Sequence, residues 1–248
     1  MPLHDSFELH RSPSWPPIPT PPNSRTPTPL PPPEDRSVPN EDRAVPAGDA
    51  GPDGSADGPT PIVGIGASAD GVDALRRFFA ELPEPQAKTH GMAFVVLPHL
   101  APDRESTLTA RLQQATALPV ETAADGAAVE PGHVYVRPPG RRLSIAEGHL
   151  QVTRSEERPA SATIDRFFRA LAADQDANAV GIVLSGTGTD GSVGLRALRE
   201  AGGVTMVQAP TEAEYDSMPQ SALATGLVDL ALPVEELAAR LVDRARER

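Results

Sequence analysis

The fold of this chain is decided by the stretch Ile62-Val63-Gly64-Ile65-Gly66-Ala67-Ser68-Ala69-Asp70-Gly71. Its apolar, β-branched first half is typical of a buried strand, and the small residues that follow predict a tight turn. Residues 72–79 then place apolar side chains at helical spacing. The stretch therefore predicts a strand, a turn and a helix, with Ser68 at the turn.

A serine at such a turn has two possible roles. Its hydroxyl can cap the helix by accepting a backbone N–H two or three residues further on. Alternatively, it can be a nucleophile at the carboxyl end of the strand, where the helix N-terminus favours developing negative charge. Caps are far commoner than nucleophiles, so the stretch alone favours a cap.

Strands and helices alternate through the rest of the chain. Besides the first strand, buried strands are predicted at 92–97, 180–184, 204–207 and 227–230. Helices are predicted at 72–79, 105–116, 163–173, 193–200, 217–225 and 233–247, with Thr163 as an N-cap. Strands that are apolar throughout and alternate with helices predict an α/β fold. Its sheet is doubly wound and mainly parallel, with helices on both faces.

Between residues 120 and 152 the pattern is different. Three short alternating pieces, 134–136, 143–145 and 150–152, are separated by glycine, proline and aspartate. This pattern predicts a small antiparallel hairpin insertion.

The first sixty residues differ from the rest of the chain. They contain sixteen of the 29 prolines and few apolar residues, and they show no helical or strand periodicity. Such a segment cannot bury a core, so residues 1–60 are predicted to be a disordered, proline-rich leader. Residues 61–248 are long enough for one well-buried α/β domain.

Composition disfavours several classes of protein. The net charge is −12 and no stripe of lysine and arginine is present, which disfavours nucleic-acid binding. There is no cysteine for a disulfide or a thiolate metal site. No apolar run approaches the ~18 residues that cross a bilayer, and no signal peptide is evident. We expect a cytoplasmic protein without membrane insertion, cofactor or metal.

Three predicted strands end in residues that can carry chemistry. Ser68 follows the first, His99 ends the second, and Asp190 follows the strand at 180–184. Because ligands bind outside the carboxyl ends of parallel strands, these residues can form a nucleophile, a general base and an orienting carboxylate. Each also has a simpler interpretation: His99 can face solvent, and Asp190 can cap its helix among glycines that could cradle a phosphate.

Two other functions fit the same pattern. Gly64-Ile65-Gly66-Ala67-Ser68-Ala69 also matches a loose dinucleotide-binding fingerprint. That kind of site needs an acidic residue at the end of the second strand, which instead reads Leu97-Pro98-His99-Leu100. The third alternative is a catalytically impaired copy that serves as an interaction module.

Three blocks of this sequence resemble the chemotaxis protein-glutamate methylesterase (CheB-type) family. They are Gly64-Ile65-Gly66-Ala67-Ser68-Ala69, Val95-Val96-Leu97-Pro98-His99-Leu100 and Leu184-Ser185-Gly186-Thr187-Gly188-Thr189-Asp190-Gly191. Further matches lie at 131–136, 201–205 and 218–219, so the resemblance covers essentially all of 61–235, in order. Residues 214–219 are most similar to the variant in methylesterase–methyltransferase fusion proteins.

The resemblance implies a hydrolase with a catalytic triad. Members of the family hydrolyse γ-glutamyl methyl esters on chemoreceptors, and some also deamidate glutamines there. By resemblance, Ser68 is the nucleophile, His99 the general base and acid, and Asp190 the orienting carboxylate. The oxyanion donors would be backbone N–H groups of Ala69, after the nucleophile, and of Thr187 and Gly188 in the glycine-rich loop. The implied partner is a methylated receptor or signalling protein.

The sequence departs from the family at three places. Asp70-Gly71 stands where the family usually has two glycines, and Pro98 where it often has glutamine. Two-domain members also carry an N-terminal phosphoreceiver domain, which a proline-rich leader cannot form. Any control by phosphorylation is therefore expected to act in trans or to be absent.

Overall fold

The structure is a computed structural model that describes residues 60–68, 71–82, 91–99, 107–154 and 162–246. The predicted proline-rich leader lies outside these ranges, except for residue 60. Within the described ranges, no helix combines the length and the apolar character that crossing a membrane requires.

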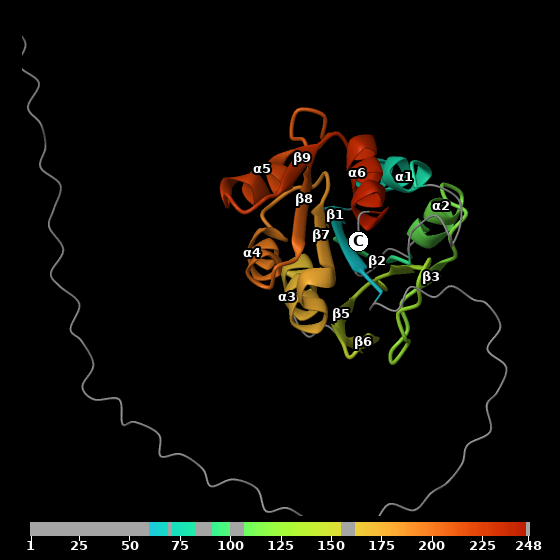
Figure 1. Cartoon of the computed structure of the whole chain (residues 1–248). Coiled ribbons are helices and arrows are strands. Elements are labelled where there is room, and N and C mark those ends of the chain that lie inside the picture. The colour runs from blue at the N-terminus through green and yellow to red at the C-terminus, as the bar shows by residue number, and fades with distance from the viewer. Residues whose placement is uncertain (1–59, 69–70, 83–90, 100–106, 155–161, 247–248) are drawn as a thin grey trace, which may run out of the picture. The chain divides into compact units, whose positions relative to one another are not determined.

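A seven-stranded parallel sheet forms the centre of the α/β part of the chain (Figure 1). Its strands lie in the order β3-β4-β2-β1-β7-β8-β9. The bounds are β1 (Ile62–Ser68), β2 (Ala93–His99), β3 (Val120–Thr122), β4 (Val134–Val136), β7 (Ala179–Val183), β8 (Val204–Gln208) and β9 (Leu230–Leu232). The central strands are buried along their length, as parallel strands covered on both faces must be. The predicted parallel sheet is confirmed.

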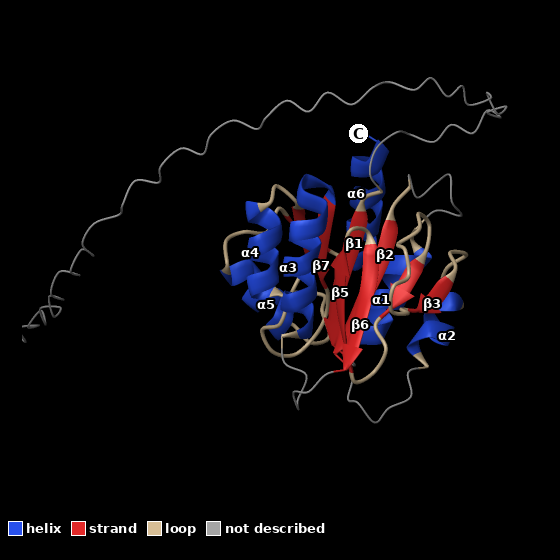
Figure 2. Ribbon diagram, turned by 90° about the horizontal axis from the view of Figure 1, so that it is seen from below, coloured by secondary structure: helices blue, strands red, loops and turns tan. Residues whose placement is uncertain are grey.

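Helices cover both faces of this sheet (Figures 1 and 2). One face carries α1 (Val72–Ala80), α2 (Leu108–Gln113) and α6 (Val234–Arg246). The other carries α3 (Thr163–Gln175), α4 (Ser192–Glu200) and α5 (Ser217–Ala224), and the 3₁₀ helix η2 (Asp176–Asn178) follows α3. The doubly wound α/β class predicted from the sequence is therefore correct.

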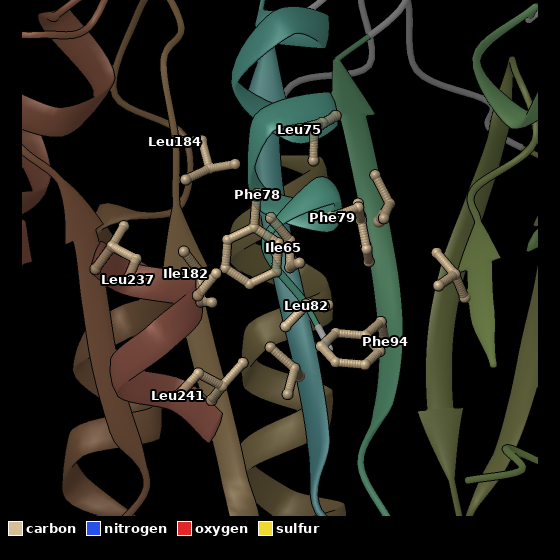
Figure 3. Packing of buried hydrophobic residues seen from close by; sticks show 14 of the residues in the cluster. Ile65, Leu75, Phe78, Phe79, Leu82, Phe94, Ile182, Leu184, Leu237 and Leu241 are labelled. Atoms are coloured by element: carbon tan, nitrogen blue, oxygen red, sulfur yellow. The ribbon is translucent and has the colours of Figure 1, made fainter. Parts of the chain in front are cut away.

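Each face has its own apolar core. Between the sheet and α1 and α6, the core is built around three phenylalanines, Phe78, Phe79 and Phe94 (Figure 3). The rings of Phe79 and Phe94 meet edge to face with centroids 5.6 Å apart, and those of Phe78 and Phe79 do so at 5.4 Å. This is a preferred packing of aromatic pairs. This core packs α1 and α6 against the sheet whose central strand, β1, ends at Ser68.

The predicted hairpin region is only partly a hairpin. β5 (Arg141–Ala146) and β6 (His149–Arg154) form an antiparallel pair, as the alternating pattern predicted. The assignment of 134–136 to the hairpin was wrong, because these residues form β4 in the main sheet, parallel to both β2 and β3. All three side chains of β4 are buried, which suits an interior strand better than a hairpin at the surface.

The last strand also begins later than predicted. Residues 227–229 form no strand, and β9 starts at Leu230. The hydroxyl of Thr205 donates to the Leu227 carbonyl at 2.7 Å and to the Asp229 carboxylate at 3.0 Å. These side-chain bonds tie residues 227 and 229, which belong to an irregular segment, to Thr205 of β8.

The strand order reverses beside β1. From β1 the chain moves to β2 on one side, and it later returns to add β7 on the other side. In doubly wound sheets, ligands bind outside the carboxyl ends of the strands at such a switch point. The carboxyl end of β1, where Ser68 lies, is therefore where a site is expected.

Candidate functional site

Ser68 and His99 are the last residues of two neighbouring strands. In the parallel register of β1 and β2 they are direct partners, and adjacent strands lie about 4.8 Å apart. The Ser68 side chain is buried. The backbone of His99 belongs to β2, whereas its side chain lies outside the described part of the chain. The fold thus brings these two predicted site residues side by side at the carboxyl edge.

Ser68 is not the residue that caps α1. The N-cap of this helix is Gly71, and Ala69 and Asp70 lie outside the described residues. The Ser68 backbone N–H donates to the Ser185 carbonyl at 3.2 Å. Among the described residues, no group forms a hydrogen bond with the Ser68 hydroxyl. The cap interpretation is therefore the weaker of the two for this serine.

The loop after β7 packs directly against Ser68 at Gly186. A Cβ added to Gly186 would lie 2.4 Å from the Met218 sulfur and 2.9 Å from the Ser68 Cβ. The Gly186 N–H donates to the Tyr215 carbonyl at 2.8 Å, and the Met218 N–H donates to the Gly186 carbonyl at 2.9 Å. Only glycine allows this loop to lie between Ser68 and the start of α5.

The predicted oxyanion donors differ in their availability. The Gly188 N–H donates to the Ser217 hydroxyl at 3.1 Å, so this donor is already used, and its role stays a prediction. Thr187 is exposed, and no acceptor for its N–H exists among the described residues. Thr187 is therefore the better candidate in this loop.

Asp190 caps a helix, but not its own. Its two carboxylate oxygens accept the backbone N–H groups of Ile164 and Asp165, both at 3.0 Å, at the start of α3. Its own helix, α4, has Gly191 at the N-cap, in a left-handed conformation. The predicted cap at Thr163 is also incorrect, because the N-cap position of α3 is Ala162.

Asp165 returns the interaction from the other helix. It lies in the first turn of α3, and its carboxylate accepts the Gly194 N–H of α4 at 2.7 Å. The two aspartates therefore cap each other's helices and lock α3 to α4. Burial raises the pKa of the Asp165 carboxyl above its ordinary value, and repulsion from Asp190 acts in the same direction. These caps fix Asp190, which lies in the loop between β7 and α4, to the start of α3.

A chain of hydrogen bonds links the loop at Ser185 to α1 and α6. The Ser185 N–H donates to the buried side chain of Gln208 at 2.7 Å. The Gln208 amide donates to Glu212 at 2.7 Å, and Glu212 accepts from Arg77 of α1 at 2.7 Å. Arg77 also binds Glu235 of α6 through two nitrogens. Because Ser185 accepts the Ser68 N–H, this network anchors the strand end that carries the serine.

We expect Gln208→Glu to destabilise the fold by about 2 kcal/mol. The substitution replaces the amide that donates to Glu212 with an oxygen, so that two partly buried carboxylates face each other. Urea denaturation measures the change in the free energy of unfolding. The matched control is Gln220→Glu, since Gln220 donates to Asp216 in the same way but is exposed. A control loss as large as that of Gln208→Glu would show that burial of the network has no special role.

Three side chains of this region were not predicted from the sequence. Asp165 and Gln208 lie inside an amphipathic helix and a strand, where nothing marks them as polar anchors. Arg137 follows β4 and is buried to 1% exposure beside the end of β2. Among the described residues, no group of three or more histidines and carboxylates could hold a metal ion.

Comparisons with known proteins match the sequence and the fold of this chain to one family. A sequence model described as CheB methylesterase matches residues 63–241. A protein-glutamate methylesterase/protein-glutamine glutaminase of Xanthomonas oryzae is 34% identical over 186 residues, which are 73% of this chain and 51% of that protein. The crystal structure of the Thermotoga maritima CheB methylesterase catalytic domain superposes with a TM-score of 0.68 at 26% identity, over 75% of this chain and 99% of that one.

A third relative is much longer. It is an uncharacterised 104.1 kDa protein of Rhodobacter capsulatus, 39% identical over 132 residues, of which the chain covers 14%. The chain thus spans about half the length of the methylesterase from Xanthomonas and a small part of the Rhodobacter protein.

Proposed function

This chain belongs to the CheB methylesterase family, and from that premise we propose that it hydrolyses γ-glutamyl methyl esters on chemoreceptor-type proteins. Deamidation of glutamine at the same positions is part of the proposal, because acyl transfer from an amide uses the same groups. The proposal assigns residues 61–248 as the catalytic domain and 1–60 as its leader. It includes a regulator that acts in trans.

The observation that carries the proposal is the position of Ser68. It ends β1 at the switch point of the sheet, in register with His99 and with a hydroxyl that no described residue binds. The loop that leads to Asp190 packs on the same serine. A nucleophile, a base and an orienting carboxylate on three strand ends are what acyl transfer requires.

In the proposed reaction, the Ser68 hydroxyl attacks the ester carbonyl carbon as His99 takes its proton. The tetrahedral intermediate collapses, and His99 returns the proton to the departing methoxide, which leaves as methanol. A water molecule then attacks the acyl-enzyme as His99 takes one of its protons, and His99 gives that proton to the departing Ser68 oxygen. The glutamic acid that is released loses its own proton to solvent. The N–H groups of Thr187 and Ala69 would stabilise the oxyanion.

Asp190 would stabilise the imidazolium form of His99. Each oxygen of its carboxylate accepts one N–H bond from α3, and a carboxylate oxygen has a second acceptor position. The carboxylate can therefore accept the imidazole N–H without leaving α3. The helix bonds hold it in one orientation, which favours a single tautomer of the histidine.

The test is release of methanol from a receptor fragment carrying radiolabelled methyl esters. We expect the full chain to release labelled methanol in a steady-state assay, with the receptor carboxylates as the other product. A folded protein that binds the methylated fragment without releasing methanol would contradict the proposal and favour an interaction module. Binding of a nicotinamide dinucleotide in place of the fragment would favour the dinucleotide alternative.

A further inference from the structure

Arg137 is a buried cation beside the candidate site. It follows β4 directly, and its side chain is 1% exposed, one of the largest fully buried side chains among the described residues. Its backbone N–H donates to the Val96 carbonyl of β2 at 3.0 Å. The guanidinium is therefore close to the last residues of β2, where His99 lies.

The donors of Arg137 bind backbone carbonyls. One terminal nitrogen donates to the Pro98 carbonyl, and the other donates to the Arg141 carbonyl at 2.7 Å and the Pro138 carbonyl at 3.4 Å. The Nε is buried and has no partner among the described residues. No described carboxylate lies within ion-pair distance, although Asp190 is near enough to act on the pKa of Arg137, which burial lowers.

Burying a cation in this way is costly. Desolvation of a guanidinium is compensated well only by a direct carboxylate partner and a full set of bonds, and an apolar side chain of similar size often gives a more stable protein. An arginine at this position therefore needs a reason other than stability. Its contacts point to one: they tie the guanidinium to the end of β2, at the Pro98 carbonyl.

The bond to Pro98 is especially informative. The carbonyl of Pro98 and the N–H of His99 belong to the same planar peptide group. By holding that carbonyl, Arg137 fixes the plane from which the His99 side chain departs.

We propose that Arg137 is a positioning residue, which orients the Pro98–His99 peptide and so fixes the point from which the His99 side chain leaves β2. It does not touch substrate. The kinetic part of this inference rests on the proposed function, whereas the bond to the peptide can be tested without any enzyme activity.

The first test is an NMR measurement on the full chain with its histidines labelled with ¹⁵N. The chain has six histidines, so the amide spectrum is simple. Arg137→Met removes the bond to the Pro98 carbonyl, and we expect the His99 amide signal to shift more than any other histidine signal. Arg137→Lys keeps a cation but loses the fork of donors, and should shift the same signal.

The second test is kinetic, on methanol release. We expect Arg137→Met to lower kcat about tenfold to hundredfold, as loss of a charge-assisted hydrogen bond would, while KM changes less than about twofold because the side chain is buried. Guanidinium ion at millimolar concentration should restore part of the activity of Arg137→Ala. The control is Arg141→Met, which removes the same charge from an exposed side chain four residues away.

The two proposals fail in different ways. If the wild-type chain releases no methanol while the His99 signal still shifts in the Arg137 variants, the proposed function fails and the positioning bond stands. If Arg137→Met folds, leaves the His99 signal in place and matches Arg141→Met in kcat, the role of Arg137 is overturned. If Arg137→Met does not fold, the same comparison is made with Arg137→Lys, which keeps the charge. A His99 signal that stays in place and a kcat equal to that of Arg141→Met then overturn the role of Arg137.

Discussion

Ser68→Ala is expected to lower the rate of methanol release by about 10⁴-fold or more, the size of loss seen when a triad nucleophile is removed. The fold should not change, because the substitution removes one oxygen that no described residue binds. The Ser68 N–H bond to Ser185 and the packing of its Cβ against Gly186 both remain. Steady-state kinetics and urea denaturation, run on the same preparation, separate the two effects.

A matched control for this variant is Ser144→Ala in the β5–β6 hairpin, which should keep the wild-type rate. Methanol release from Ser68→Ala at a rate close to wild type would contradict the assignment of the nucleophile, whatever the effect on stability. It would leave the fold and the family membership intact.

Asp190→Asn is the second large effect that we expect. The amide cannot hold the histidine in the required tautomer, and the corresponding change in a serine triad costs about 10⁴-fold in kcat. The asparagine also presents an NH₂ group to one of two N–H groups at the start of α3. Loss of that cap should lower the free energy of unfolding by about 1–2 kcal/mol.

Asp165, which caps α4 as Asp190 caps α3, supplies the control for this variant. Asp165→Asn weakens the cap of α4 in the same way and should cost a similar amount of stability. It should lower kcat less than about tenfold, because Asp165 faces α4 and not the strand ends. If both variants lose the same activity, Asp190 acts only as a helix cap and the triad is incorrect.

The sequence predicted the parts of the fold that repeat a local pattern. Apolar runs such as 62–66 and 180–184 can be recognised as strands because a parallel strand is buried on both faces. The placement of Ser68 and His99 at the same edge of the sheet could also be predicted, since parallel strands end at the same edge. The sequence analysis did not place β4 in the main sheet, because an apolar pattern over three residues is too short to distinguish an interior strand from a hairpin strand.

The polar contacts that hold the site residues in place could not be predicted from the sequence. Asp165 and Asp190 are far apart in the sequence, and their exchange of caps exists only once α3 and α4 pack together. Arg137 reads as an ordinary loop residue before a pair of prolines, and its burial depends on how β4 inserts beside β2. Such tertiary contacts between polar groups carry no local periodicity.

The central claim is that the alcohol of Ser68 and the imidazole of His99 meet at the carboxyl edge of the sheet. A crystal structure of the same preparation that releases methanol measures this directly, as the distance from the Ser68 Oγ to the nearer imidazole nitrogen. The account predicts about 2.6–3.2 Å, or slightly more without substrate. An imidazole turned away into solvent, with the Ser68 hydroxyl bound to another group, would contradict it.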